Sequence, residues 1–178
     1  MAKIFVVDDD ILVLKAISKL LSIKGYSVKE ARSGQEAIQI LKNEVFDLII
    51  SDIRMAGIDG IQVVEQLRNM GRNTPVILVT GYASEEAPVE AYRLGVSDYI
   101  LKPFDKDDLL NKVEKNLINR KEKIIDLSKL LAELENTVEQ FQNKNDLLIF
   151  ENEELKFFLK KLDAIIFSLK KYQVKVNA

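Results

Sequence analysis

Histidine and cysteine are both absent from this chain of 178 residues. Without cysteine there is no disulfide scaffold, thiolate zinc site or thiol nucleophile, and without histidine there is no Ser-His-Asp triad and no histidine phosphodonor. No apolar run approaches the roughly 18 residues that a membrane span needs, and no signal peptide is expected. The 26 basic and 28 acidic residues give a net charge of −2, which disfavours bulk affinity for nucleic acid. We therefore expect a soluble, cytoplasmic protein.

Glycine and proline are scarce and unevenly placed. All 7 glycines and all 3 prolines lie within residues 1–103. Because these residues punctuate turns, the first part is predicted to be a domain with many short connections. The remainder contains no helix breaker and is predicted to be an uninterrupted helix. The chain thus divides into a globular domain over 1–120 and an extension of its last helix over 110–178.

Short apolar runs alternate with amphipathic segments in the first part. Continuous apolar runs such as 4–7 and 76–79 are typical of strands that are buried on both faces. Predicted strands span 3–7, 27–30, 47–51, 75–80 and 98–102. Predicted helices span 11–23, 34–43, 59–70, 87–95 and the region from 105 onward, with Gly25, Gly71 and Gly95 as helix C-caps. This alternation predicts an α/β fold with a five-stranded parallel sheet covered on both faces.

Polar and charged residues follow the predicted strands. Asp8, Asp9 and Asp10 follow the first predicted strand. Asp52 directly follows the third strand, Thr80 is the last residue of the fourth, and Lys102 is the last residue of the fifth. Carboxyl ends of parallel strands meet at the edge where ligands bind. Two carboxylates about 4 Å apart repel by roughly 4 kcal/mol at an effective dielectric of 20, so a hard cation such as Mg²⁺ is expected among them. Carboxylate nucleophile, metal and lysine are the parts of a site that receives a phosphoryl group.

Four motifs at the ends of predicted strands occur in one order: VVDDD at 6–10, SDIRMAGIDG at 51–60, VTGYAS at 79–84 and DYILKPF at 98–104. On these motifs, residues 1–120 resemble the receiver domain of response regulators in two-component signalling. The resemblance implies a flavodoxin-like (βα)₅ fold. It also implies no enzyme activity beyond the domain's own phosphorylation and dephosphorylation.

The resemblance implies a role for each motif residue. Asp52 is the expected phosphoacceptor, and Asp8 and Asp9 are expected to bind Mg²⁺ with Asp52 and the backbone carbonyl of Arg54. Lys102 is expected to contact the phosphoryl oxygens through a cis peptide bond to Pro103.

Further residues are expected to act in switching. Thr80 would bind the phosphoryl group, Tyr99 would rotate in response, and Gly81 would leave room for the phosphodonor. Ala56 stands where the family usually has proline, which is expected to loosen the loop after Asp52. Pro88 is expected to delay the start of the fourth helix and to leave a mobile stretch over 81–87.

Alternatives remain for the acidic residues. Asp10 is expected to cap the first helix instead of binding metal. A phosphatase of the haloacid-dehalogenase type, with Asp8 as nucleophile and Asp10 as general acid, is a remote alternative for which the chain has no cap insertion. A flavin or nucleotide binder is disfavoured, since no glycine-rich turn follows the first strand.

A seven-residue apolar repeat runs from 110 to 176. Its a positions are Leu110, Leu117, Ile124, Leu131, Val138, Asn145, Asn152, Leu159, Ile166 and Gln173. Its d positions are Val113, Arg120, Leu127, Leu134, Phe141, Leu148, Leu155, Leu162, Leu169 and Val176. Leucine at d and asparagine at a favour a parallel two-stranded coiled coil, so a parallel homodimer is predicted. A higher oligomer, or a hairpin that folds back near 143–146, remains open.

The expected function is that of a response regulator. A sensor histidine kinase would phosphorylate Asp52, and the change would pass through the fourth helix, the fifth strand and the fifth helix into the coil. The alternative is a constitutive coiled-coil scaffold that phosphorylation only modulates. No helix-turn-helix or basic region is present, so direct nucleic-acid contact is not expected. The lysine- and phenylalanine-rich stretch 155–176 is compatible with an anionic membrane surface, but a coiled-coil end is favoured.

Overall fold

The computed structural model describes residues 1–81, 93–144, 156–157, 159–167 and 170. The chain divides into two compact units, Met1–Arg120 and Lys121–Ala178, and each is described by itself. The expected fourth helix over 87–95, Pro88 and the asparagines at 145 and 152 lie mostly or wholly outside the described residues. None of the helices that the structure describes combines the length and the apolarity that a membrane crossing requires.

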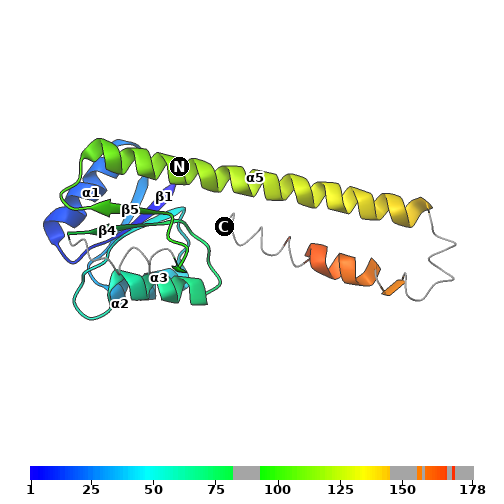
Figure 1. Ribbon diagram of the computed structural model, residues 1–178, viewed down its shortest axis with the longest axis horizontal. Helices are drawn as coiled ribbons and strands as arrows, with labels where there is room; N and C mark the ends of the chain where they lie inside the picture. The colour runs from blue at the N-terminus through cyan, green and yellow to red at the C-terminus, as the bar shows by residue number, and fades with distance from the viewer. Residues whose placement is uncertain (82–92, 145–155, 158, 168–169, 171–178) are drawn as a thin grey trace. The chain divides into compact units, whose positions relative to one another are not determined.

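The first unit is built around a parallel sheet of five strands in the order β2-β1-β3-β4-β5 (Figure 1). The strands are β1 (Lys3–Val7), β2 (Ser27–Ala31), β3 (Leu48–Asp52), β4 (Val76–Thr80) and β5 (Asp98–Leu101). The described helices with printed bounds are α1 (Ile11–Ile23), α2 (Gly34–Asn43), α3 (Gly60–Asn69) and α5 (Lys106–Lys144), and residues 156–157, 159–167 and 170 are also helical. The predicted α/β fold with a five-stranded parallel sheet is confirmed, whereas the coiled coil stays a prediction. The predicted bounds of these elements agree with the structure to within a residue where a bound was set.

Local side-chain contacts explain where the helices begin. The carboxylate of Asp10 accepts the backbone N–H groups of Leu12 and Val13, so Asp10 caps α1 as predicted. Asp59 and Gln62 form a reciprocal capping box at the start of α3. The predicted C-cap glycines all have positive φ, which a glycine adopts without steric cost: Gly25, Gly71 and Gly95.

Two apolar layers hold helices on opposite faces of the sheet. Alternate residues of β1 point to opposite faces, with Ile4 in one buried cluster and Phe5 in the other. The first cluster contains residues of α1 and α5, and the second contains residues of α2 and α3. Figure 1 shows the same arrangement, with α1 and α5 on one side of the sheet and α2 and α3 on the other. β3 and β4 are buried at every position because they lie between these layers.

Helix α5 is fastened to the sheet along its first part. Its apolar residues Leu109, Leu110, Val113 and Leu117 belong to the same buried cluster as β1 and β4. At the end of this region the guanidinium of Arg120 donates to the backbone carbonyl of Phe46 at 2.6 Å and lies 3.5 Å from the Asp47 carboxylate. Burial lowers the pKa of Arg120, and the nearby Asp47 opposes that shift. Arg120, a polar residue at a d position of the repeat, therefore bonds to the loop before β3.

We expect Arg120→Met to destabilise the first unit by about 2 kcal/mol, because it keeps the aliphatic packing but removes a charged hydrogen bond to a carbonyl. Thermal unfolding followed by circular dichroism would measure this loss. Lys121→Met, at the exposed neighbouring position, is the matched control and should leave the melting temperature nearly unchanged. Equal stability of the two variants would contradict an anchoring role for Arg120.

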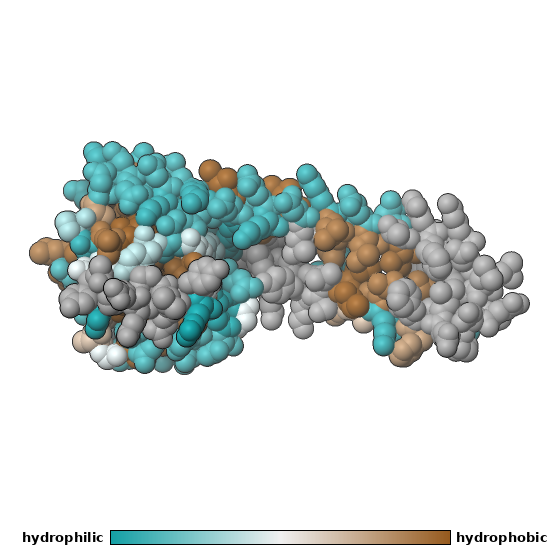
Figure 2. Space-filling view, viewed as in Figure 1, coloured by the Kyte–Doolittle hydropathy of each residue, from teal (hydrophilic) through white to brown (hydrophobic). Residues whose placement is uncertain are grey.

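The second unit contradicts the prediction of one uninterrupted helix. The helical residues of 156–170 pack against α5, and a small apolar cluster joins the two segments: Leu134, Val138, Leu159, Leu162 and Ile166. In a continuous helix Val138 and Ile166 would lie about 42 Å apart, so they could not share a cluster. The hairpin that the repeat left open is the arrangement that the described residues form. Figure 2 shows apolar side chains gathered on the described residues of this second unit, Lys121–Ala178, which we call the tail.

Candidate functional site

The register of the sheet brings the ends of four strands together. Val7 of β1 pairs with Ser51 of β3, and Asp52 at the end of β3 pairs with Val79 of β4. On the other side of β4, Thr80 pairs with Leu101 of β5. Residues that directly end or follow these strands therefore share one edge: Asp8, Asp52, Thr80 and Lys102.

Three carboxylates converge at this edge. Asp8, Asp9 and Asp52 each present a carboxylate oxygen, and these oxygens all lie within 4.8 Å of one another. Asp8 and Asp52 are only 1% and 4% exposed, whereas Asp9 is exposed. Oxygen ligands of this kind suit a hard divalent cation such as Mg²⁺, and one exposed member leaves the site open to solvent. The predicted acidic cluster is therefore assembled by the fold.

Lys102 bridges the two buried carboxylates. Its Nζ lies 2.7 Å from Oδ2 of Asp8 and 2.7 Å from Oδ1 of Asp52. Burial acts to lower the pKa of this lysine, but its hydrogen bonds to Asp52 and Asp8 outweigh burial, so the pKa of Lys102 is raised. The lysine stays charged across the neutral range and offsets part of the repulsion between the aspartates. Its peptide bond to Pro103 is cis, as predicted.

Burial also affects the carboxylate of Asp52. The pKa of Asp52 is raised, chiefly because burial penalises the charged carboxylate, and the charge of Asp8 adds to this. Contacts with Lys102 and the backbone N–H of Arg54 oppose the rise. Asp52 is thus a poorly hydrated carboxylate held by a lysine, and a further cation would stabilise its charged form.

The loop after Asp52 is tied to the acidic cluster by Ala56. The backbone N–H of Ala56 donates to Oδ2 of Asp9 at 3.2 Å. A proline at this position would have no N–H to donate. The expected loosening of the loop is therefore opposed by a hydrogen bond that alanine makes possible, and Ala56 adds a contact that orients a site carboxylate.

Gly60 is a site residue that the sequence analysis missed. A Cβ at this position would lie 2.1 Å from the backbone oxygen of Asp52, far inside van der Waals contact. The N–H of Gly60 also donates to the carbonyl of Ile53 at 2.9 Å. The first turn of α3 therefore approaches the Asp52 backbone as closely as it does only because position 60 lacks a side chain. Gly60 is the last glycine of the 51–60 motif, which is the only sign of its importance in the sequence. Its close approach to the Asp52 backbone could not be predicted from the residues around it.

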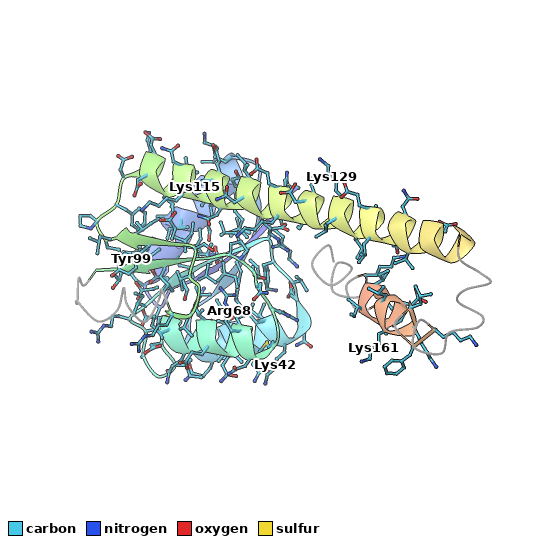
Figure 3. All side chains as sticks on the ribbon, turned by 45° about the vertical axis from the view of Figure 1, so that its right-hand side comes forward. Lys42, Arg68, Tyr99, Lys115, Lys129 and Lys161 are labelled. Atoms are coloured by element: carbon cyan, nitrogen blue, oxygen red, sulfur yellow. The ribbon has the colours of Figure 1, made fainter. Side chains whose placement is uncertain are left out.

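Thr80 and Tyr99 occupy the predicted places on β4 and β5. Thr80 is 1% exposed, and its carbonyl accepts the backbone N–H of Lys102 at 2.7 Å. Tyr99, labelled in Figure 3, is half-buried and packs against the apolar cluster on the α2–α3 side. Its carbonyl accepts a hydrogen bond from Nζ of Lys112 on α5 at 2.8 Å. Among the described residues, no atom lies within 4 Å of a Cβ built at Gly81.

Asp10 takes no part in the acidic cluster. Its Oδ1 accepts the N–H groups of Leu12 and Val13 at 2.8 and 3.3 Å, while its own N–H donates to Oδ1 of Asp8. A carboxylate engaged in capping is poorly placed to act as a general acid. This removes the geometric support for the phosphatase alternative, which required Asp10 in that role.

Comparison with solved structures finds the same architecture. The chain aligns with a CheY-like response regulator receiver domain protein from Methanospirillum hungatei JF-1 with a TM-score of 0.67 and 32% identity, over 69% of this chain and 98% of that one. It aligns with the response regulator protein TrrA from Thermotoga maritima, solved in complex with Mg²⁺ and BeF, with a TM-score of 0.60 and 31% identity. That alignment covers 65% of this chain and 99% of that one.

Curated relatives match over the same region. The transcriptional regulatory protein ZraR of Escherichia coli (strain K12) is 41% identical over 114 residues, which are 64% of this chain and 26% of ZraR. The regulatory protein AtoC of the same strain is 38% identical over 107 residues, which are 60% of this chain and 23% of AtoC. The chain therefore spans about a quarter of the length of these relatives.

The model of the response regulator receiver domain matches residues 4–114. This range contains β2, β3, β4 and β5, all of β1 except Lys3, the acidic cluster and Lys102. On the match, the fold and the arrangement of the site, the chain belongs to the response regulator receiver domain family.

Proposed function

We propose that the protein is the receiver of a two-component system, in which Asp52 accepts a phosphoryl group from a sensor histidine kinase in the presence of Mg²⁺. The observation that carries the proposal is the placement of the buried Asp52 carboxylate beside Asp8, with Lys102 Nζ 2.7 Å from both. These 178 residues contain no histidine, so none of them can carry the phosphohistidine that donates the phosphoryl group.

Each residue has a distinct task in this reaction. A carboxylate oxygen of Asp52 attacks phosphorus, the bond from phosphorus to the donor nitrogen breaks, and an acyl phosphate forms on Asp52. The ammonium group of Lys102 pairs with the Asp52 carboxylate and can pair with the phosphoryl oxygens once they are attached. Thr80, at the end of the adjacent strand, supplies a hydroxyl to the same oxygens. The protein's chemistry is then confined to its own phosphorylation and dephosphorylation.

Asp8, Asp9 and Asp52, with the backbone carbonyl of Arg54, would hold Mg²⁺. The three carboxylate oxygens within 4.8 Å form a set of hard oxygen ligands that fits this ion. When bound, Mg²⁺ supplies positive charge that neutralises the phosphoryl oxygens. The relative TrrA, solved with Mg²⁺ and BeF, supports the assignment.

We expect Mg²⁺ to stabilise the protein in a way that depends on pH. Because burial raises the pKa of Asp52 in the metal-free protein, this carboxylate is protonated at a higher pH than an exposed aspartate. The contribution of Asp52 to metal-free stability is therefore present at low pH and lost as pH rises through its folded pKa. Mg²⁺ binds the ionised form, so its affinity should rise with pH over the same range and then level off.

Thermal unfolding with and without millimolar Mg²⁺, repeated from pH 4 to pH 8, measures this linkage. At a hundredfold excess over the dissociation constant, binding adds about 2.7 kcal/mol. Asp52→Asn removes the titrating group and should flatten the pH dependence of whatever stabilisation remains. A melting temperature that is the same with and without Mg²⁺ at every pH would contradict the metal site.

Phosphorylation is proposed to act on residues 87–95, on β5 and on α5. Lys112 supports this route, since it joins α5 to the carbonyl of Tyr99 and lies 3.5 Å from the Asp98 carboxylate. Through α5 the change would reach the tail, where we propose pairing with a second copy as a parallel homodimer. The alternative is a constitutive scaffold whose tail assembles partners and whose affinity phosphorylation only modulates. We propose that this activity takes place in the cytoplasm, and we expect no direct contact with nucleic acid.

Incubation with a small phosphodonor and Mg²⁺, followed by intact mass measurement, tests the central proposal. One added phosphoryl group is expected, and peptide mapping should place it on Asp52. Light scattering with Mg²⁺ and beryllofluoride then separates the two proposals for the tail. Pairing that responds to the mimic supports the regulated coil, and pairing that does not respond supports the scaffold.

A further inference from the structure

The core of the tail hairpin is made of the residues that a coiled-coil dimer would bury. In the repeat, Val138, Leu159 and Ile166 are a positions, and Leu134 and Leu162 are d positions. These five residues make up the apolar cluster between α5 and the second helical segment. No described member of this cluster lies outside the a and d positions. A side chain that packs inside the hairpin cannot also pack against a second chain, so the two pairings compete.

The hairpin has an ion pair that a parallel dimer lacks. Lys170 is paired with Glu135, and both residues are e positions of the repeat. In an antiparallel pair of helices the e positions face one another. In a parallel pair each e position faces a g position of the partner, and here those positions hold Leu130 and Ile165. The charges on Glu135 and Lys170 therefore favour the folded-back arrangement.

The parallel dimer would in turn cover apolar surface that the hairpin leaves in water. Leu130 is 63% exposed and Ile165 is 52% exposed, although both flank the apolar seam at g positions. In a parallel pair these side chains would lie along the edge of the interface. Each arrangement has a contact that the other lacks, as a two-state element requires. The arms of the hairpin are seen in Figure 3, with Lys129 on the first and Lys161 on the second.

We infer that the tail is a self-association surface closed by its own second arm, residues 156–170. A second copy of this chain is the partner, and the second arm must leave the first before two tails can pair along their whole seam. The inference rests on the proposed pairing of tails and adds to it the state that opposes pairing. Formation of the dimer then depends on concentration and on any condition that opens the hairpin.

The absence of cysteine from the 178 residues permits a direct test in this whole chain. A Val138→Cys/Ile166→Cys double variant places two thiols within one apolar cluster. Oxidation at low protein concentration should form an intramolecular disulfide and lock the hairpin. We expect the locked protein to remain a monomer by light scattering at concentrations where the reduced protein is a dimer, with or without Mg²⁺ and beryllofluoride. The single variant Val138→Cys reports the other state, because its thiols meet only when two chains pair in parallel register.

The charge pair offers a second test without a cross-link. Lys170→Glu sets two acids against each other in the hairpin but faces no charge in a parallel dimer, so it should favour dimerisation by about threefold. The matched control is the exchange Glu135→Lys/Lys170→Glu, which restores the ion pair and should return the dimerisation constant to its original value.

A locked hairpin that dimerises as well as its reduced form would overturn the inference. So would a Lys170→Glu variant whose dimerisation equals that of the exchange variant. Should the reduced chain stay monomeric at all concentrations and Val138→Cys form no disulfide between chains, the proposed pairing of tails fails and the inference fails with it. The intramolecular disulfide of the double variant still reports the hairpin separately, and the mass of phosphorylated Asp52 reports the receiver.

Discussion

Replacement of Asp52 by asparagine should abolish phosphoryl uptake while leaving the chain folded. Asparagine keeps the size of the side chain but lacks the charged oxygen that attacks phosphorus. It also relieves the burial of a charge next to Asp8, although the ion pair with Lys102 is lost. Removal of a nucleophile eliminates the covalent route itself, so no residual acyl phosphate is expected. Intact mass measurement after incubation with a small phosphodonor and Mg²⁺ would detect uptake of a single phosphoryl group.

Asp10→Asn is the matched control for this experiment. Asp10 lies two residues from Asp8 in the same acidic run, but its carboxylate caps α1. Asparagine is an equally good N-cap, so both stability and phosphorylation should stay near those of the original protein. A phosphoryl group found on Asp8, or phosphorylation that survives Asp52→Asn and is lost in Asp10→Asn, would contradict the receiver mechanism and revive the phosphatase alternative.

Replacement of Gly60 by alanine should have the second large effect. The added Cβ would lie 2.1 Å from the backbone oxygen of Asp52 and 3.0 Å from the Cα of Ile53. Both neighbours are backbone atoms, so a change of rotamer cannot relieve the overlap, and α3 must move away from β3. We expect a loss of about 3 kcal/mol in the free energy of unfolding, at the upper end for overpacking. The melting temperature should fall on the order of 10 °C.

Gly81→Ala is the control for Gly60→Ala. Gly81 also belongs to a site motif, but a Cβ there has no neighbour within 4 Å among the described residues. Its melting temperature should therefore stay close to that of the original protein. The rate of phosphorylation separates the two further, because Gly60→Ala displaces Asp52 whereas Gly81→Ala affects only the approach of the donor. Equal stability of the two variants would show that the contact between α3 and Asp52 yields without strain.

The acidic cluster was predictable because its parts follow local rules. A buried strand is a run of apolar residues, and its carboxyl end is where that run stops, so Asp8, Asp52 and Lys102 could be assigned to one edge before any contact was known. Asp10 as a helix cap follows from the same kind of local pattern. The contacts of Gly60 and Ala56 were not predictable in this way. Both depend on how closely two segments approach, and neither a glycine at the start of a helix nor an alanine in a loop indicates which segment will lie beside it.

The tail shows most clearly which features follow from the sequence and which depend on the tertiary structure. The order of strands and helices, the acidic edge and the apolar seam of the tail are written in periodicity and in residue type. An a–d repeat predicts that one face of a helix is buried, but it does not predict what covers that face. The same side chains can pack against a second chain or against a later segment of the same chain. Arg120 at a d position and the Glu135–Lys170 pair acquire meaning only when the segments that they join are in place. The described residues show that the seam is covered by a later segment of the same chain. Only the tertiary structure decides this, because contacts between segments far apart in sequence depend on how the chain is arranged and not on its local pattern.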